Sequence, residues 1–102
     1  MRTMAQSPAV LDGYLALSGA LGKGTLGRAL GEQVALVVAE RNGCHYCAAA
    51  HTLLGRGAGL DDAAIAAARN GTAAEPRAAA ALTFAEAVVA TRGHVADADL
   101  DA

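Results

Sequence analysis

Helix-ending signals divide this chain into short segments, and they restrict its fold more than any other feature. Asn42-Gly43 and Asn70-Gly71 are typical left-handed C-terminal caps, while Pro8 and Pro76 suit the first position of a helix. Only 3% of the residues are aromatic, and much of the apolar content is alanine. Strands draw on β-branched and aromatic residues, so this composition favours packed helices. We therefore expect an all-α fold.

The helix start and stop signals predict a single-domain bundle of about five to six helices. We expect helices over residues 8–21, 26–41, 44–57, 61–70 and 76–92, with the first turn of a sixth near Asp97. The apolar run 34–39 resembles a buried strand, but the helical pattern around it exceeds strand length and no second strand exists to pair with it. Two helices should each carry one apolar face: Val10, Tyr14, Leu15, Leu17 and Leu21 in the first, and Ala80, Phe84, Ala87, Val88 and Thr91 in the fifth.

Length and charge exclude several classes of protein. The 102 residues suffice for one domain with its own core, so residues 1–102 are read as one unit. The net charge is −2 and the basic residues are scattered, which argues against nucleic acid or an acidic membrane as partner. The apolar runs fall far short of the ~18 residues that span a bilayer. The first ten residues lack the apolar core of a secretory signal, so we expect a cytoplasmic protein.

The two cysteines form the most informative motif. Cys44 and Cys47 lie three positions apart, so a bridge between them closes a very small loop and restrains the unfolded chain little. In a reducing compartment such a pair is more often catalytic or metal-binding than structural. If residues 44–57 are helical, Cys44, Cys47 and His51 fall within roughly 60° of one another around the helix axis.

A carboxylate precedes this motif. Glu32 shares its helix face with alanine and leucine and therefore needs a polar partner, for which His51 is the obvious candidate. Cys44 stands at a helix start, where free N–H groups and the helix dipole stabilise a thiolate. The full pattern is Glu-x11-Cys-x2-Cys-x3-His.

At Glu32, Cys44, Cys47 and His51 the chain resembles the AhpD-like branch of the carboxymuconolactone decarboxylase superfamily. The likeness is strongest from Glu32 to Leu60 and looser over most of the chain. It implies an all-helical fold, a thiol peroxidase or disulfide reductase activity, and trimers or hexamers. The family pattern also implies further C-terminal helices, so we expect either a short C-terminal end or a sequence that is a fragment of a longer protein.

The resemblance also assigns roles. It implies that peroxide oxidises Cys47, that Cys44 then closes the disulfide, and that Glu32 and His51 relay the proton. The dipole argument alone would instead favour Cys44 as the attacking sulfur. Well-studied peroxidases of the family have a further His just before the second cysteine, where this chain has Tyr46, so the strength of its peroxidase activity is open. Tyr46 is predicted to pack, or alternatively to line a substrate entrance.

The family's redox chemistry implies no bound cofactor. An external dithiol such as dihydrolipoamide would restore the cysteines, with a peroxiredoxin or a lipoyl protein as a possible partner and a hydroperoxide or small disulfide as substrate. Two other readings stay open. One is acid–base chemistry on a lactone or carboxylate by His51 and Glu32, as in the decarboxylase branch. The other is a zinc-binding or structural subunit. Its zinc ligands would be Cys44, Cys47 and His51, with Glu32 or His45 as the fourth. Strong structural zinc sites usually have a second pair of cysteine or histidine ligands in another segment, and this sequence has no second cysteine pair.

Overall fold

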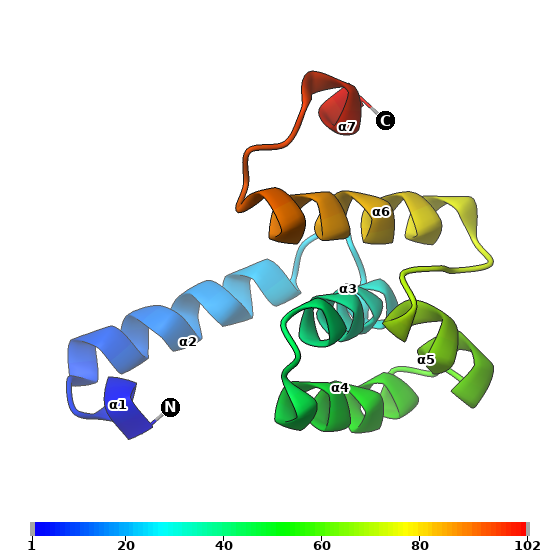
Figure 1. Cartoon of the computed structure of the whole chain (residues 1–102). Helices are drawn as coiled ribbons and strands as arrows, with labels where there is room; N and C mark the ends of the chain where they lie inside the picture. Colours follow the sequence, from blue (N-terminus) through cyan, green and yellow to red (C-terminus); the bar gives the residue numbers. More distant parts are fainter. Residues whose placement is uncertain (1, 102) are drawn as a thin grey trace.

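In the computed structural model, which describes residues 2–101, every regular element is a helix (Figure 1). The helices are α1 (Arg2–Ala5), α2 (Pro8–Gly22), α3 (Arg28–Arg41), α4 (His45–Gly57), α5 (Asp62–Arg69), α6 (Pro76–Thr91) and α7 (Asp97–Asp101). The all-α prediction is confirmed. The five expected helices correspond to α2–α6, and the expected first turn of a sixth is α7. The sequence prediction has no counterpart of α1, because its four residues carry no capping signal.

Helix α3 lies at the centre of the body, with α4, α5 and α6 packed around it (Figure 1). The core consists of Leu36 and Val37 from α3, Ile65 and Ala68 from α5, and Leu82 from α6. The apolar run 34–39 lies within α3, so its helical assignment is confirmed. The core side chains of α5 and α6 are buried against those of α3. Because burial of apolar surface stabilises these contacts, α3 fixes where α5 and α6 lie.

The capping signals act as the sequence predicts. Gly43 and Gly71 both have positive φ angles, 65° and 79°, and directly follow Asn42 and Asn70, the C-cap residues of α3 and α5. Asp61 caps α5 by accepting a hydrogen bond from the Ala64 N–H at 2.7 Å. Pro76 occupies the first turn of α6. Helix α3 begins two residues later than expected, because Gly27 at φ 88° is its N-cap.

The apolar face predicted for α2 is exposed in the structure. None of the α2 residues is buried, and α2 packs mainly against α1 (Figure 1). Its five large apolar residues are 45–70% exposed: Val10, Tyr14, Leu15, Leu17 and Leu21. An apolar stripe shows that a helix requires a partner, but it does not say that the partner lies in the same chain.

Helix α6 packs on the core with a different face from the apolar one predicted from the sequence. Ala78 and Leu82 are buried and Ala85 packs against the core, whereas Phe84 is 39% exposed. Positions 78, 82 and 85 lie almost opposite the predicted face at about 100° per residue. Both faces of this alanine-rich helix are apolar, so the pattern alone does not select between them. No helix in the described part of the chain is long and apolar enough to cross a membrane.

Candidate active site

The end of α3 positions Cys44 directly. The Gly43 N–H donates to the Glu40 carbonyl at 3.1 Å, and the Cys44 N–H donates to the Ala39 carbonyl at 3.0 Å. These two bonds form a Schellman motif, which needs the left-handed conformation that Gly43 supplies. The chain then reverses at once, and Cys44 is also the N-cap of α4. One residue thus ends one helix and begins the next.

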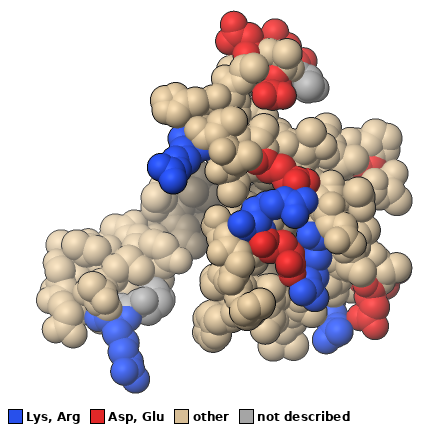
Figure 2. Space-filling model, viewed as in Figure 1, with Lys and Arg blue, Asp and Glu red and all other residues tan. Residues whose placement is uncertain are grey.

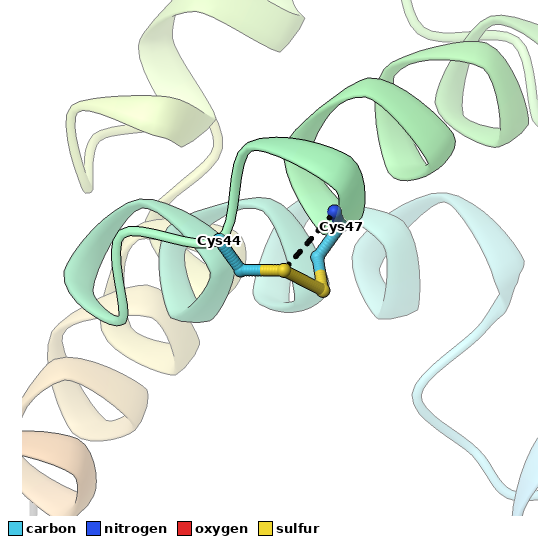
Figure 3. Close-up of a disulfide and its surroundings, with 2 residues drawn as sticks. All are labelled: Cys44 and Cys47. Carbon is cyan, nitrogen blue, oxygen red and sulfur yellow. Dashed lines mark hydrogen bonds between the residues drawn. A yellow bond between two sulfur atoms is a disulfide. The ribbon is translucent and has the colours of Figure 1, made fainter.

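Cys44 and Cys47 form a disulfide across the first turn of α4 (Figure 3). The Sγ atom of Cys44 also accepts a hydrogen bond from the Cys47 N–H at 3.2 Å, drawn as the dashed line in Figure 3. A sulfur here replaces the side-chain oxygen that usually caps a helix. Both cysteines are partly exposed, so a small molecule reaches the bridge from solvent.

Glu32 of α3 and His51 of α4 meet as a pair. The His51 Nδ1 atom lies 2.7 Å from the Glu32 Oε2 atom, and the side chains are 34% and 18% exposed respectively. The predicted pairing of these two residues is therefore observed. When the carboxylate is ionised and the ring neutral, the Nδ1–H of His51 donates a hydrogen bond to Glu32, and Nε2 is the acceptor nitrogen of the ring.

Gly55 allows α4 to approach α3 at this point. It is buried, and a Cβ atom there would lie 3.3 Å from Leu60 Cδ1, 3.7 Å from Ile65 Cγ1 and 3.9 Å from Glu32 Cβ. Helix α4 continues through Gly55 to Gly57, as the expected helix over residues 44–57 does. The spacing of four between Gly55 and His51 was the available signal, because residues four apart share a helix face.

Cys47, His51 and Gly55 follow one another at intervals of four along α4. Side chains of a helix tilt toward its N-terminus, so the His51 ring leans over the turn that holds Cys47. The site thus combines a redox-active type of sulfur pair with an imidazole one turn away and a carboxylate that orients this imidazole. Such a set can transfer protons to and from a reacting sulfur.

The remaining candidates lie outside this cluster. Tyr46 is 84% exposed, so the prediction that it packs is wrong for this chain. His45 is exposed as well. Among residues 2–101, no group of three or more His, Cys, Asp or Glu side chains is arranged to hold a metal ion.

Comparison with protein families identifies the family of the chain. The model of the carboxymuconolactone decarboxylase family matches residues 8–98, which is most of the chain. The chain belongs to this family. The resemblance drawn from the Glu, Cys-x2-Cys and His pattern is thereby confirmed, since the carboxymuconolactone decarboxylase family includes AhpD-like proteins. No curated protein and no solved structure matches the chain significantly.

Proposed function

We propose that this member of the carboxymuconolactone decarboxylase family is a thiol-dependent antioxidant enzyme that reduces hydroperoxides or disulfides. One observation carries the proposal: the Cys44–Cys47 disulfide lies one helical turn from the paired His51 and Glu32. A purely structural bridge three residues apart adds little stability, and it has no need of an oriented imidazole beside it.

The oxidative half of the cycle begins at Cys47. Its thiolate attacks one oxygen of the hydroperoxide, the O–O bond breaks, and the alkoxide leaves and takes up a proton to become an alcohol. Cys47 is left as a sulfenic acid. The Cys44 thiolate then attacks the Cys47 sulfur, the S–S bond forms, and hydroxide leaves and is protonated to water. With a disulfide substrate, Cys47 forms a mixed disulfide that Cys44 resolves in the same way.

The hydrogen bond from the Cys47 N–H to Cys44 Sγ supports this division of roles. An amide N–H aimed at a sulfur stabilises its thiolate, so Cys44 is suited to be the resolving nucleophile. In the reductive half the same bond favours Cys44 as the leaving group when an external thiolate attacks Cys47. The dipole argument for Cys44 and the family's assignment of Cys47 then describe two different steps, and they no longer conflict.

His51 and Glu32 form the proton relay in this proposal. Nε2 of His51 accepts the proton of the Cys47 thiol and returns it to the departing alkoxide or hydroxide. Glu32 holds the ring through Nδ1 and stabilises the imidazolium that forms in between. Exposed Tyr46 is proposed to line the entrance through which the substrate reaches the sulfurs.

The reductant, setting and assembly are part of the proposal. A dithiol of the dihydrolipoamide class supplies two electrons, attacks Cys47 and leaves as its own cyclic disulfide. A lipoyl protein or a peroxiredoxin is the proposed protein partner, and no resident cofactor takes part. We further propose a cytoplasmic setting, where thiol reductants are available, and homo-oligomers such as trimers or hexamers.

Acid–base chemistry on a lactone or carboxylate is the rival activity. The pair of His51 and Glu32 would serve it without any sulfur chemistry. Replacing both cysteines by serine distinguishes the two: that change abolishes a dithiol cycle, whereas it leaves a decarboxylase-type reaction largely intact.

The test is a free-thiol count on fully reduced protein before and after one equivalent of an organic hydroperoxide, with Cys47→Ser beside it. We expect the parent to lose both thiols and Cys47→Ser to react far more slowly. If peroxide spares both thiols while oxidised lipoamide consumes them, the chain is a disulfide reductase. Inertness to both reagents would overturn the proposal.

A further inference from the structure

Helix α2, here named the arm, is an apolar helix without a partner in the described body of its own chain. Val10, Tyr14, Leu17 and Leu21 recur at intervals of four, three and four, which places them in one stripe. All four are exposed, and Leu21 is 70% exposed. From Met4 to Gly22 the only charged residue is Asp12. Figure 2 shows the matching surface, where tan atoms dominate the part that projects from the body.

The arm is a poor helix by itself. Isolated helices of this length are marginal in water, and interior glycines weaken them by roughly 0.5–1 kcal/mol each. Gly13 and Gly19 lie inside α2, and a Cβ at either would meet no other atom within 4 Å, so neither glycine is required by packing within the chain. The arm therefore needs an external surface to stabilise it.

The body offers a matching groove between α3 and α6. All of its lining residues are apolar: Leu26, Val34, Val38, Ala81, Phe84, Ala85, Val88 and Val89, around a cavity of about 370 Å³. Leu26 lies just before α3, so the groove begins where the arm is attached. The arm itself leads away from α3 and α6 (Figure 1), and none of its residues lines this groove.

The loop that joins the arm to α3 is bonded to the body. Arg77 Nη2 of α6 donates to the Thr25 carbonyl at 3.0 Å, which ties the loop between α2 and α3 to α6. To cover the groove of its own chain, the arm would have to reverse its direction within residues 22–25. A helix from another copy reaches the same groove without any change of this loop.

We propose that the arm of one copy docks in the groove of a second copy. This inference rests on the homo-oligomers proposed above and not on the redox chemistry. An arm in a groove is a heterologous contact, so it closes either as a reciprocal dimer or as a ring such as the proposed trimer.

The available area suits a stable interface. Exposures of 45–70% amount to on the order of 100 Å² per large residue, so the four residues of the stripe offer roughly 400 Å². A stable interface takes about 800 Å² from each partner. In a reciprocal dimer each copy contributes both an arm and a groove to the same interface, and the two contacts together reach about this size. Neither surface brings a charge that would need a partner in the contact.

The experiment compares the solution mass of the full reduced chain with that of five lysine variants, by light scattering after size exclusion. Leu17→Lys charges the arm and Phe84→Lys charges the groove; both positions are exposed, so the body fold is kept. Ala16→Lys, on the arm face that holds Asp12, and Thr83→Lys, beside Phe84 on α6, are the matched controls. Far-UV circular dichroism verifies folding, and Leu21→Lys repeats the arm test.

We expect the parent and both controls to be oligomers, and Leu17→Lys and Phe84→Lys each to shift to the single-chain mass of 10.1 kDa. An equimolar mixture of these two variants should regain a two-chain species, because it holds one intact arm and one intact groove. If Phe84→Lys stays oligomeric while Leu17→Lys does not, arms pair with arms and the inference is wrong. A monomeric parent overturns it too. Since mass is the readout, a chain that assembles in this way yet ignores peroxide refutes only the proposed activity.

Discussion

Glu32 brings a carboxylate into a helix face whose neighbours, Leu36 and Ala39, are buried. Withdrawing a charge from water is costly unless a partner takes part of the hydrogen bonding. His51 supplies this partner at 2.7 Å, and the two side chains stay accessible enough for protons to exchange with solvent. The pair therefore combines partial burial with proton access, which suits a relay.

Replacing Glu32 by glutamine should slow the reaction of the thiols with hydroperoxide or oxidised lipoamide by roughly 10²-fold, because a positioned acid–base group contributes at least that much. Glutamine keeps the shape but no longer stabilises the imidazolium of His51. The rate of thiol loss under excess oxidant measures the effect. Glu40→Gln on the same helix is the control, since Glu40 pairs with Arg69 on the exposed surface. Equal rates for the two variants would remove Glu32 from the relay.

Cys44 also has a structural role, because its sulfur caps the N-terminus of α4. Under reducing conditions, where no bridge forms, Cys44→Ser should be at least as stable as the parent, while Cys44→Ala should be less stable than the serine variant by about 1 kcal/mol. Serine retains a capping oxygen and alanine does not. Urea unfolding followed by circular dichroism gives the free energies. Identical midpoints for the two variants would show that the cap contributes nothing.

At the scale of elements, the sequence predicted where helices end better than which faces they bury. Cap signals such as Asn42-Gly43 act through bonds within a few residues, so they are readable locally. The buried face of α6 and the exposed face of α2 depend on what lies opposite, which an alanine-rich pattern does not record. Because the cap signals are local, the all-α class and five helices could be predicted from the sequence. The faces with which α2 and α6 pack could not be predicted.

The site shows the same division. The spacing of Cys44, Cys47 and His51 predicted one helix face, and the apolar surroundings of Glu32 predicted its partner. The role of Gly55, which lets α4 pack close to α3, was not predicted, because it depends on the distance between the two helices. The sulfur cap of α4 likewise requires the backbone geometry at Cys44.

The link between α3 and α4 depends on Gly43. Its φ of 65° strains any residue with a Cβ, although a Cβ atom at this position would meet no other atom within 4 Å. Gly43→Ala should therefore lower the free energy of unfolding by about 1 kcal/mol. Gly31→Ala, inside α3 with equally open surroundings, should raise it by about 0.5–1 kcal/mol. Thermal or urea unfolding measures both, and a stabilised Gly43→Ala would contradict the backbone argument.

For the whole molecule, stability is concentrated in α3 and its neighbours. Exposed ion pairs such as Arg41 with Glu86, and Arg56 with Asp62, join these helices, but pairs of this kind contribute at most about 1 kcal/mol each. In Figure 2 blue and red atoms lie side by side on the body. The apolar core must therefore supply most of the stability, while the arm adds little within a single chain.

Two leucine truncations test this distribution. Leu82 is fully buried, so Leu82→Ala should cost about 3 kcal/mol, a large part of the roughly 5–15 kcal/mol of a typical domain. Leu53 on α4 is 70% exposed. Leu53→Ala deletes the same atoms as Leu82→Ala, but at a position in contact with water, so the free energy of unfolding should change by no more than about 0.5 kcal/mol. Urea unfolding at one fixed protein concentration compares them, because assembly would otherwise shift the midpoints. A large loss for Leu53→Ala would reveal that this face of α4 is covered in solution, whereas a small loss for Leu82→Ala would mean that the body does not depend on the contact of α6 with α3.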